Sequence, residues 1–131
     1  MPFVCTLVLA LSTLLVTPAA DAKDAVTRPF YISGEISFLD FSDEGTATHF
    51  GRFASVADDA SAATGKYYTA NGDLVYWKAV SFDFVTLTGV IEFTGGTGRF
   101  LGATGGYTYT FVPLDASFTI FSYTGKGTIT Y

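Results

Sequence analysis

The chain has 131 residues, of which 49% are hydrophobic, 17% aromatic and 15% charged, and its formal net charge is −5 at pH 7. This length fits one domain. The acidic balance, without any cluster of Lys or Arg, excludes the usual signature of proteins that bind nucleic acid or an anionic membrane surface. A single histidine, His49, and a single cysteine, Cys5, leave no set of metal ligands, so we expect neither a metal nor a cofactor.

The first 22 residues are expected to be a cleaved secretory signal. Phe3 to Val16 form an apolar run, and Ala20-Asp21-Ala22 fits the small-x-small pattern of a signal peptidase site. The run is shorter than the ~18–20 apolar residues that a membrane span needs. One departure from the usual signal pattern is that no Lys or Arg precedes the run. We therefore expect a secreted or periplasmic domain over residues 23–131, with no membrane anchor and, since Cys5 leaves with the signal, no disulfide.

Residues 23–131 predict short strands separated by turns, with no helical period. The expected strands are residues 30–38, 46–56, 67–69, 74–84, 85–93, 107–112, 117–123 and 128–131. The expected turns and loops are residues 42–45, 57–61, 70–73, 94–106, 113–115 and 124–127. Among them, Asn71-Gly72 is the strongest signal for a two-residue hairpin. Seven or eight strands at this spacing predict an all-β barrel or sandwich.

Charged residues inside the expected strands are predicted to point outward, because an unpaired charge is costly to bury. These residues are Glu35, Arg52, Lys78, Asp83 and Glu92. Any that pointed inward would be a candidate acid, base or orienting group. The acidic pairs Asp43-Glu44 and Asp58-Asp59 are interpreted instead as solvated turn residues.

The most informative segment is a corner dense in glycine between two strands. It contains Gly95-Gly96-Thr97-Gly98-Arg99-Phe100, followed by Ala103-Thr104-Gly105. Glycine adopts positive φ at little cost and lets two backbones approach closely. We therefore expect Gly95, Gly96, Gly98, Phe100 and Gly105 to be structural, and Arg99 to brace nearby carbonyl groups.

This corner resembles the C-terminal half of plant dirigent proteins and of the related allene oxide cyclases, and uncharacterised bacterial exported proteins share it. The resemblance covers residues 90–131 and rests on Gly-Gly-Thr-Gly-x-Phe followed by Ala-x-Gly at matching spacing. It implies a single antiparallel barrel of about eight strands with a hydrophobic cavity, and it implies dimers or trimers. Dirigent proteins orient radicals, and the cyclases close a ring by shaping their substrate. The residues that do so lie on strands outside the matching segment, so no catalytic residue is assigned.

Four residues are candidates for ligand binding inside the barrel. Trp77 shares a strand face with Val75 and Ala79, and Tyr107 and Tyr109 alternate with threonine after the corner. His49, expected in the middle of a strand, is either a rim residue or a polar group in the cavity. No arrangement in the sequence supplies a nucleophile with its base.

Three classes of function stay open at this point. The barrel could bind a small hydrophobic or aromatic ligand, it could be a packed structural barrel without a ligand, or it could be a cyclase-like or isomerase-like enzyme. The interior distinguishes them, because small barrels either fill with side chains or hold one ligand. An open cavity lined by aromatic residues favours binding, and a buried charge within it favours an enzyme.

Overall fold

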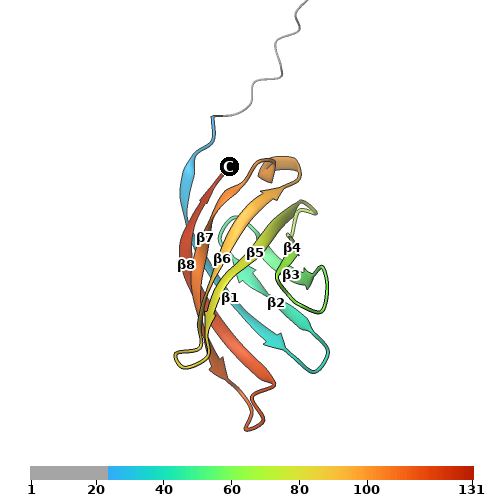
Figure 1. Ribbon diagram of the computed structural model, residues 1–131. Helices are drawn as coiled ribbons and strands as arrows, with labels where there is room; N and C mark the ends of the chain where they lie inside the picture. Colours follow the sequence, from blue (N-terminus) through green and yellow to red (C-terminus); the bar gives the residue numbers. More distant parts are fainter. Residues whose placement is uncertain (1–23) are drawn as a thin grey trace, which may run out of the picture.

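The structure is a computed structural model that describes residues 24–131, so the expected signal at residues 1–22 lies outside the described residues. Eight strands and one short 3-10 helix form the described part (Figure 1). The strands are β1 (Thr27–Ser37), β2 (Ser42–Ala47), β3 (Gly51–Ala57), β4 (Thr64–Tyr68), β5 (Leu74–Asp83), β6 (Thr88–Gly96), β7 (Thr104–Pro113) and β8 (Ile120–Thr130), with the helix η1 (Gly98–Phe100) between β6 and β7. No helix in these residues has the length and apolar character to cross a membrane.

The strands form a closed antiparallel barrel. Each strand pairs with the next one along the chain, and β8 pairs with β1 over the full length of both to close the sheet. The expected barrel of eight strands is therefore confirmed. In this up-and-down order the β1–β2, β3–β4, β5–β6 and β7–β8 loops lie toward one end of the barrel, which we call the mouth. The C-terminus and η1 lie at the opposite end (Figure 1).

Two expected turns are strands in the structure. Residues 42–45 belong to β2, where Asp43 lies between Ile36 of β1 and Ser55 of β3 in the hydrogen-bonded register. Residues 124–127 lie within β8, which runs unbroken for 11 residues. Gly127 stands there because a Cβ at this position would lie 1.9 Å from the main-chain oxygen of Gly106. The glycines of β8 therefore mark a close approach of two strands, and the interpretation of a turn was wrong.

The expected strand over residues 46–56 is divided. Thr48-His49-Phe50 forms a turn between β2 and β3, and His49 has a left-handed backbone with φ of 70°. The expectation that His49 lies in mid-strand was therefore wrong. The Asn71-Gly72 turn is confirmed between β4 and β5, and its glycine has φ of 89°.

The glycine corner has the structural role expected of it. Gly98 and Gly105 have positive φ, and a Cβ on Gly105 would lie 2.3 Å from the main-chain oxygen of Thr128. Phe100 is fully buried. The Arg99 guanidinium donates a hydrogen bond to the main-chain oxygen of His49, as expected for a residue that braces carbonyl groups. The corner thus ties η1 to the β2–β3 turn at the end opposite the mouth.

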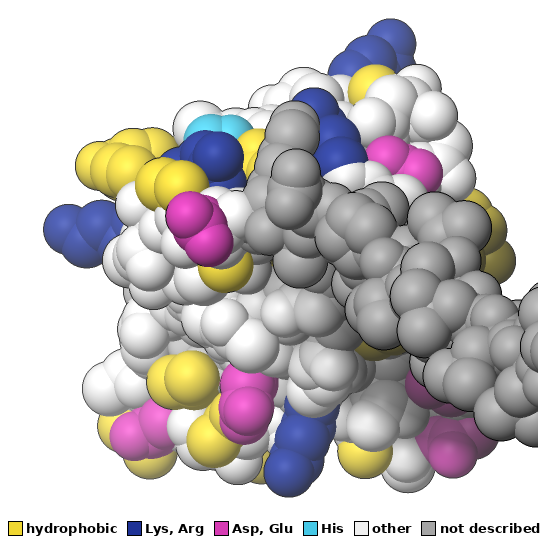
Figure 2. Space-filling model, turned by 90° about the horizontal axis from the view of Figure 1, so that it is seen from above, with side chains coloured by type: hydrophobic (Ala, Val, Ile, Leu, Met, Phe, Trp, Pro, Cys, Tyr) yellow, Lys and Arg dark blue, Asp and Glu magenta, His cyan; other side chains and the backbone are white. Residues whose placement is uncertain are grey.

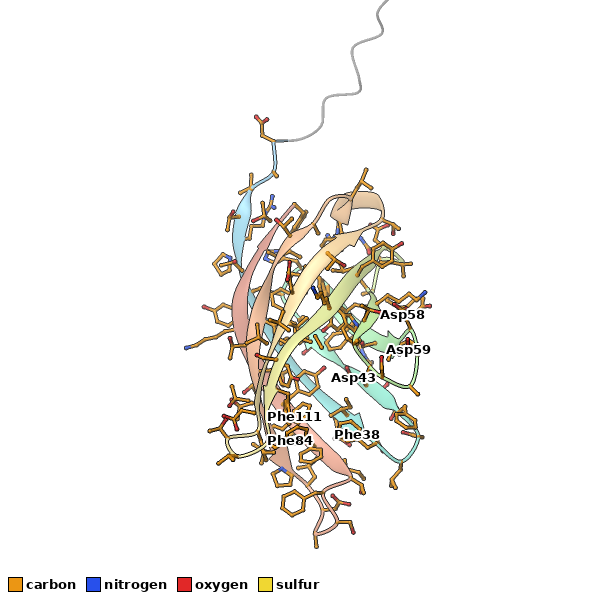
Figure 3. All side chains as sticks on the ribbon, in the orientation of Figure 1. Phe38, Asp43, Asp58, Asp59, Phe84 and Phe111 are labelled. Carbon is orange, nitrogen blue, oxygen red and sulfur yellow. The ribbon has the colours of Figure 1, made fainter. Side chains whose placement is uncertain are left out.

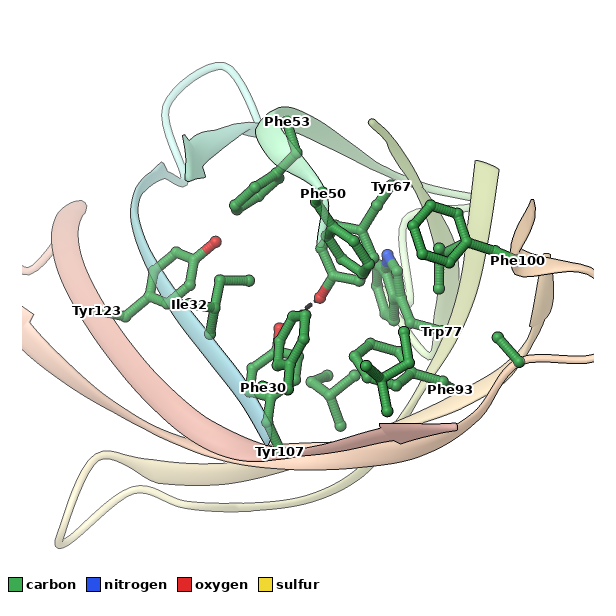
Figure 4. Packing of buried hydrophobic residues seen from close by; sticks show 14 residues of the cluster. Phe30, Ile32, Phe50, Phe53, Tyr67, Trp77, Phe93, Phe100, Tyr107 and Tyr123 are labelled. Atoms are coloured by element: carbon green, nitrogen blue, oxygen red, sulfur yellow. Dashed lines mark hydrogen bonds between the residues drawn. The ribbon is translucent and has the colours of Figure 1, made fainter. Parts of the chain in front are cut away.

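Aromatic rings fill the half of the barrel next to η1 (Figure 4). Phe30 lies at the centre of this cluster, with ring centroids 5.0 Å from Phe50, 5.0 Å from Phe93 and 5.4 Å from Tyr107. Burying one such side chain contributes roughly 1.5–3 kcal/mol. The cluster therefore stabilises this end of the barrel through contacts that do not involve the mouth loops.

Several large inward side chains face a glycine on the neighbouring strand. In the register, Trp77 is opposite Gly65 and Tyr109 is opposite Gly89. A Cβ on Gly89 would lie 2.4 Å from the ring of Tyr109. The interior of a barrel of eight strands is only just wide enough for side chains. At these two positions the ring occupies the space that a side chain on the neighbouring strand would need.

We predict that Gly89→Ala lowers the free energy of unfolding by about 1–3 kcal/mol, because the new methyl group overlaps the Tyr109 ring. The three atoms nearest to that methyl all belong to Tyr109. In a Tyr109→Ala background the same substitution should therefore change stability by less than about 0.5 kcal/mol. Urea unfolding of the native protein, Gly89→Ala, Tyr109→Ala and the double variant measures the coupling free energy between the two residues. An equal cost in both backgrounds would show that the two residues do not compete for space.

Candidate ligand-binding site

The half of the barrel next to the mouth is open. A cavity of about 680 Å³ enters between the mouth loops and reaches inward to Tyr67, Trp77 and Tyr107. This volume lies within the ~300–1,000 Å³ of typical small-molecule sites. Most of the residues that line it are Phe, Tyr or Trp. The barrel is therefore packed at one end and hollow at the other.

One carboxyl group lies in this apolar cavity. Asp43 of β2 accepts a hydrogen bond of 2.6 Å from the Tyr123 hydroxyl of β8. Ser55 on β3 is the register partner of Asp43, and its hydroxyl favours the ionised form of the carboxyl group. In the part of the chain that the structure describes, Asp43 is the single charged residue among those that line the cavity. Figure 3 shows it midway along the barrel, with Phe38 and Phe111 nearer the mouth.

Burial raises the pKa of Asp43 from 3.8 to about 6, although the hydroxyls of Tyr123 and Ser55 act in the opposite direction. The same apolar surroundings also change the pKa values of the neighbouring tyrosine hydroxyls. Burial, and then the negative charge of Asp43, raises the pKa of Tyr107, Tyr109 and Tyr123. These hydroxyls therefore stay protonated at neutral pH, while Asp43 gains and loses a proton close to it.

Hydrogen bonds fix the side chains at the floor of the cavity. The Tyr67 and Tyr107 hydroxyls bond to each other (Figure 4). The Trp77 indole N–H donates to Ser55 Oγ at 3.0 Å, and Ser55 is the register partner of Asp43, which accepts the hydrogen bond from Tyr123. Among residues 24–131, no buried side-chain nitrogen or oxygen lacks a partner. The polar side chains at the inner end of the cavity therefore have hydrogen-bond partners without a ligand.

Each mouth loop presents one residue with a left-handed backbone to the cavity. This collar consists of Phe41 (φ 58°), Ala62 (φ 50°), Leu87 (φ 56°) and Phe118 (φ 55°). Such a backbone costs a residue with a side chain about 1–2 kcal/mol, and glycine would avoid that cost. Phe41 is 75% exposed, so it gains little from burial. Backbone strain of this kind gathers at functional sites.

Three of the four residues expected to bind ligand do line the cavity, namely Trp77, Tyr107 and Tyr109. His49 does not. It lies at the opposite end, where its ring nitrogens are 3.0 Å from the Pro29 carbonyl oxygen and 3.2 Å from the Tyr131 hydroxyl. Figure 2 views that end of the molecule and shows several Lys and Arg side chains on it.

The charged residues noted inside strands are all exposed, as expected: Glu35, Arg52, Lys78, Asp83 and Glu92. Asp58 and Asp59 also lie in a loop as expected. Asp43 is the exception, since its interpretation as a solvated turn residue was wrong. Its place in the cavity follows from the pairing of β2 with both β1 and β3.

Comparison with known proteins adds a likeness of fold. No family model and no curated protein matches the chain. The solved structure of a pterocarpan synthase dirigent protein is similar, with a TM-score of 0.48 and 10% sequence identity over 82% of this chain and 84% of that chain. This likeness concerns the fold, and no residue, ligand or activity is transferred from that protein to this chain.

The raised pKa of Asp43 predicts that the native protein loses stability as pH rises. The folded state holds the proton up to about pH 6, whereas the unfolded chain releases it near 3.8. The contribution is complete below pH 3.8 and is lost through pH 6, by at most about 3 kcal/mol. Asp43→Asn should remove this decline and be the more stable protein at pH 8. Urea unfolding of the native protein and of Asp43→Asn between pH 4.5 and 8 measures both effects. If the free energies of unfolding of the two proteins depended on pH in the same way, the raised pKa of Asp43 would be contradicted.

Proposed function

We propose that the protein is an exported small barrel that binds one compact hydrophobic or aromatic molecule in its open half. The observation that supports this proposal is the apolar cavity of about 680 Å³ beside a half that is already filled. The filled half stabilises the fold, so the hollow half is free to hold a ligand. Its volume lies in the range of pockets that enclose one small organic molecule.

A packed structural barrel fits the cavity less well. Empty volume in a core costs stability, because the side chains around it lose contacts. A barrel with no ligand would gain by filling this space with larger residues. Instead, Ala57 and Ala79 line the cavity where longer side chains would close it. The walls are apolar and the hydroxyl and carboxyl groups lie together, which suits a molecule with one polar group.

A cyclase-like or isomerase-like activity is a second candidate, favoured by Asp43. A carboxyl group with a pKa of about 6 in an apolar cavity can accept or donate a proton near neutral pH. Tyr123 is placed to orient the carboxyl group through its hydrogen bond. Recovery of a bound compound in changed form, with the change abolished by Asp43→Asn while binding persists, would favour the enzyme. Recovery of the unchanged compound would favour binding alone.

Export of the domain is proposed on the sequence of residues 1–22. N-terminal sequencing of protein from the medium or periplasm should begin at Lys23. Intact Met1 in that material would contradict cleavage.

The ligand proposal predicts saturable binding that Trp77 reports, because the single tryptophan lines the cavity. Titration with small aromatic compounds should change Trp77 fluorescence, with a Kd below ~1 mM for the best of them, which corresponds to about 4 kcal/mol. Ala79→Phe, which extends into the cavity, should weaken binding at least tenfold. Val80→Phe is the matched control, since Val80 is exposed on the same strand. Absence of saturable binding, or equal effects of both variants, would contradict the proposal.

A further inference from the structure

We propose that the ligand is an organic cation, an ammonium group on an aromatic or hydrophobic body, with its nitrogen held beside Asp43. This inference rests on the proposed function and names the chemical class of its ligand. Three independent features of the structure support it: the carboxylate inside the cavity, the rings around it and the charge of the mouth.

The first feature is a carboxylate without a counter-charge. The hydrogen-bond partner of Asp43 is the neutral hydroxyl of Tyr123, and its register partner Ser55 is neutral as well. Within the described residues, the lining of the cavity includes no Lys, Arg or His. A carboxylate in an apolar site is stable only when it is paired and hydrogen-bonded. A positively charged ligand would complete the pairing, whereas an anionic ligand would be repelled.

The second feature is a group of aromatic rings around the same space. Phe111 has ring centroids 5.0 Å from Tyr109, 5.2 Å from Phe121 and 5.9 Å from Tyr123, and all four rings line the cavity. The face of an aromatic ring carries negative potential, so it attracts a cation within ~6 Å of its centroid. A neutral ligand gains contact area from these rings, and an ammonium group gains this attraction as well.

The third feature is the charge of the mouth. Its loops carry Asp40, Asp58, Asp59 and Asp115, and β5 ends beside the mouth with Asp83. Residues 38–41, 58–63, 84–87 and 114–119 include no Lys or Arg. Figure 3 shows Asp58 and Asp59 on the β3–β4 loop. Loops that carry one sign of charge around an entrance draw ions of the opposite sign toward it and raise the rate of entry.

The test uses three compounds of similar size at about pH 8: trimethylphenylammonium, cumyl alcohol and benzoate. The first is permanently charged, so only the protein titrates. Cumyl alcohol has nearly the same shape, is neutral and can donate a hydrogen bond to Asp43. Trp77 fluorescence should show the cation binding at least tenfold more tightly than the alcohol, and benzoate binding most weakly.

Two variants locate the nitrogen. Asp43→Asn should lower the affinity for trimethylphenylammonium at least tenfold and change the affinity for cumyl alcohol by less than threefold. Glu44→Gln is the matched control, because Glu44 is the adjacent carboxylate on β2 and is exposed. It should leave both affinities within twofold of the native protein.

The native protein provides a measurement that requires no variant. The advantage of the cation should fall as pH is lowered from about 8 to 4.5, because Asp43 takes up a proton with a pKa of about 6. The other titratable groups that act on Asp43 are Glu44 on β2, Tyr67 on β4, Tyr107 and Tyr109 on β7 and Tyr123 on β8. The phenols keep their protons throughout this range, and the Glu44→Gln control removes the remaining carboxylate.

The outcomes separate the two proposals. If none of the compounds binds, the proposed function itself fails for ligands of this size. If cumyl alcohol or benzoate binds as tightly as the cation, the cavity binds ligands but the cation inference is overturned. A preference for the cation that survives both Asp43→Asn and low pH would overturn the position of the nitrogen. Only a preference that is lost in both measurements supports the inference.

Discussion

The structure depends on a limit of space inside the barrel: three of its large aromatic rings lie over a neighbouring strand, and the residue beneath each of them is glycine. Trp77 lies over Gly65, Tyr109 over Gly89, and the ring of Tyr123 lies over Gly34. The same pairing places the rings of the floor and walls at fixed depths. The glycines that permit these rings therefore determine the shape of the cavity as much as the rings do.

The division into a filled and a hollow half follows from this limit. Near η1, rings from several strands meet at the barrel axis and leave no room, with Phe30, Phe50 and Phe93 almost fully buried. Toward the mouth, alanines and serines replace some of the rings on the inner face. The hollow half is therefore lined partly by small side chains, such as those of Ala57 and Ala79. It also keeps Asp43 in apolar surroundings that alter its ionisation.

The spacing of strands and turns predicted a barrel or a sandwich, because both are local signals, and the resemblance of the glycine corner implied the barrel of about eight strands that the structure has. Sequence reasoning also predicted that Trp77 lies inward, since Val75 and Ala79 share its face. It failed at Asp43 because Ser-Asp-Glu-Gly has the composition of a turn, and only pairing with two other strands makes it β2. It failed at His49 for the opposite reason, since a segment with strand composition turns there with a left-handed backbone. Both errors concern contacts between distant segments, which no local pattern records.

The up-and-down order of the strands has a consequence for how such a barrel can diversify. Each mouth loop joins two strands that are adjacent both along the chain and in the sheet. A loop can therefore lengthen, shorten or change composition without altering the register of any strand pair. Changes in Phe41, Leu87 or Phe118 would reshape the entrance while the far end keeps the chain folded. The packed end near η1 and the mouth loops can thus change independently, and each mouth loop can be replaced without the others.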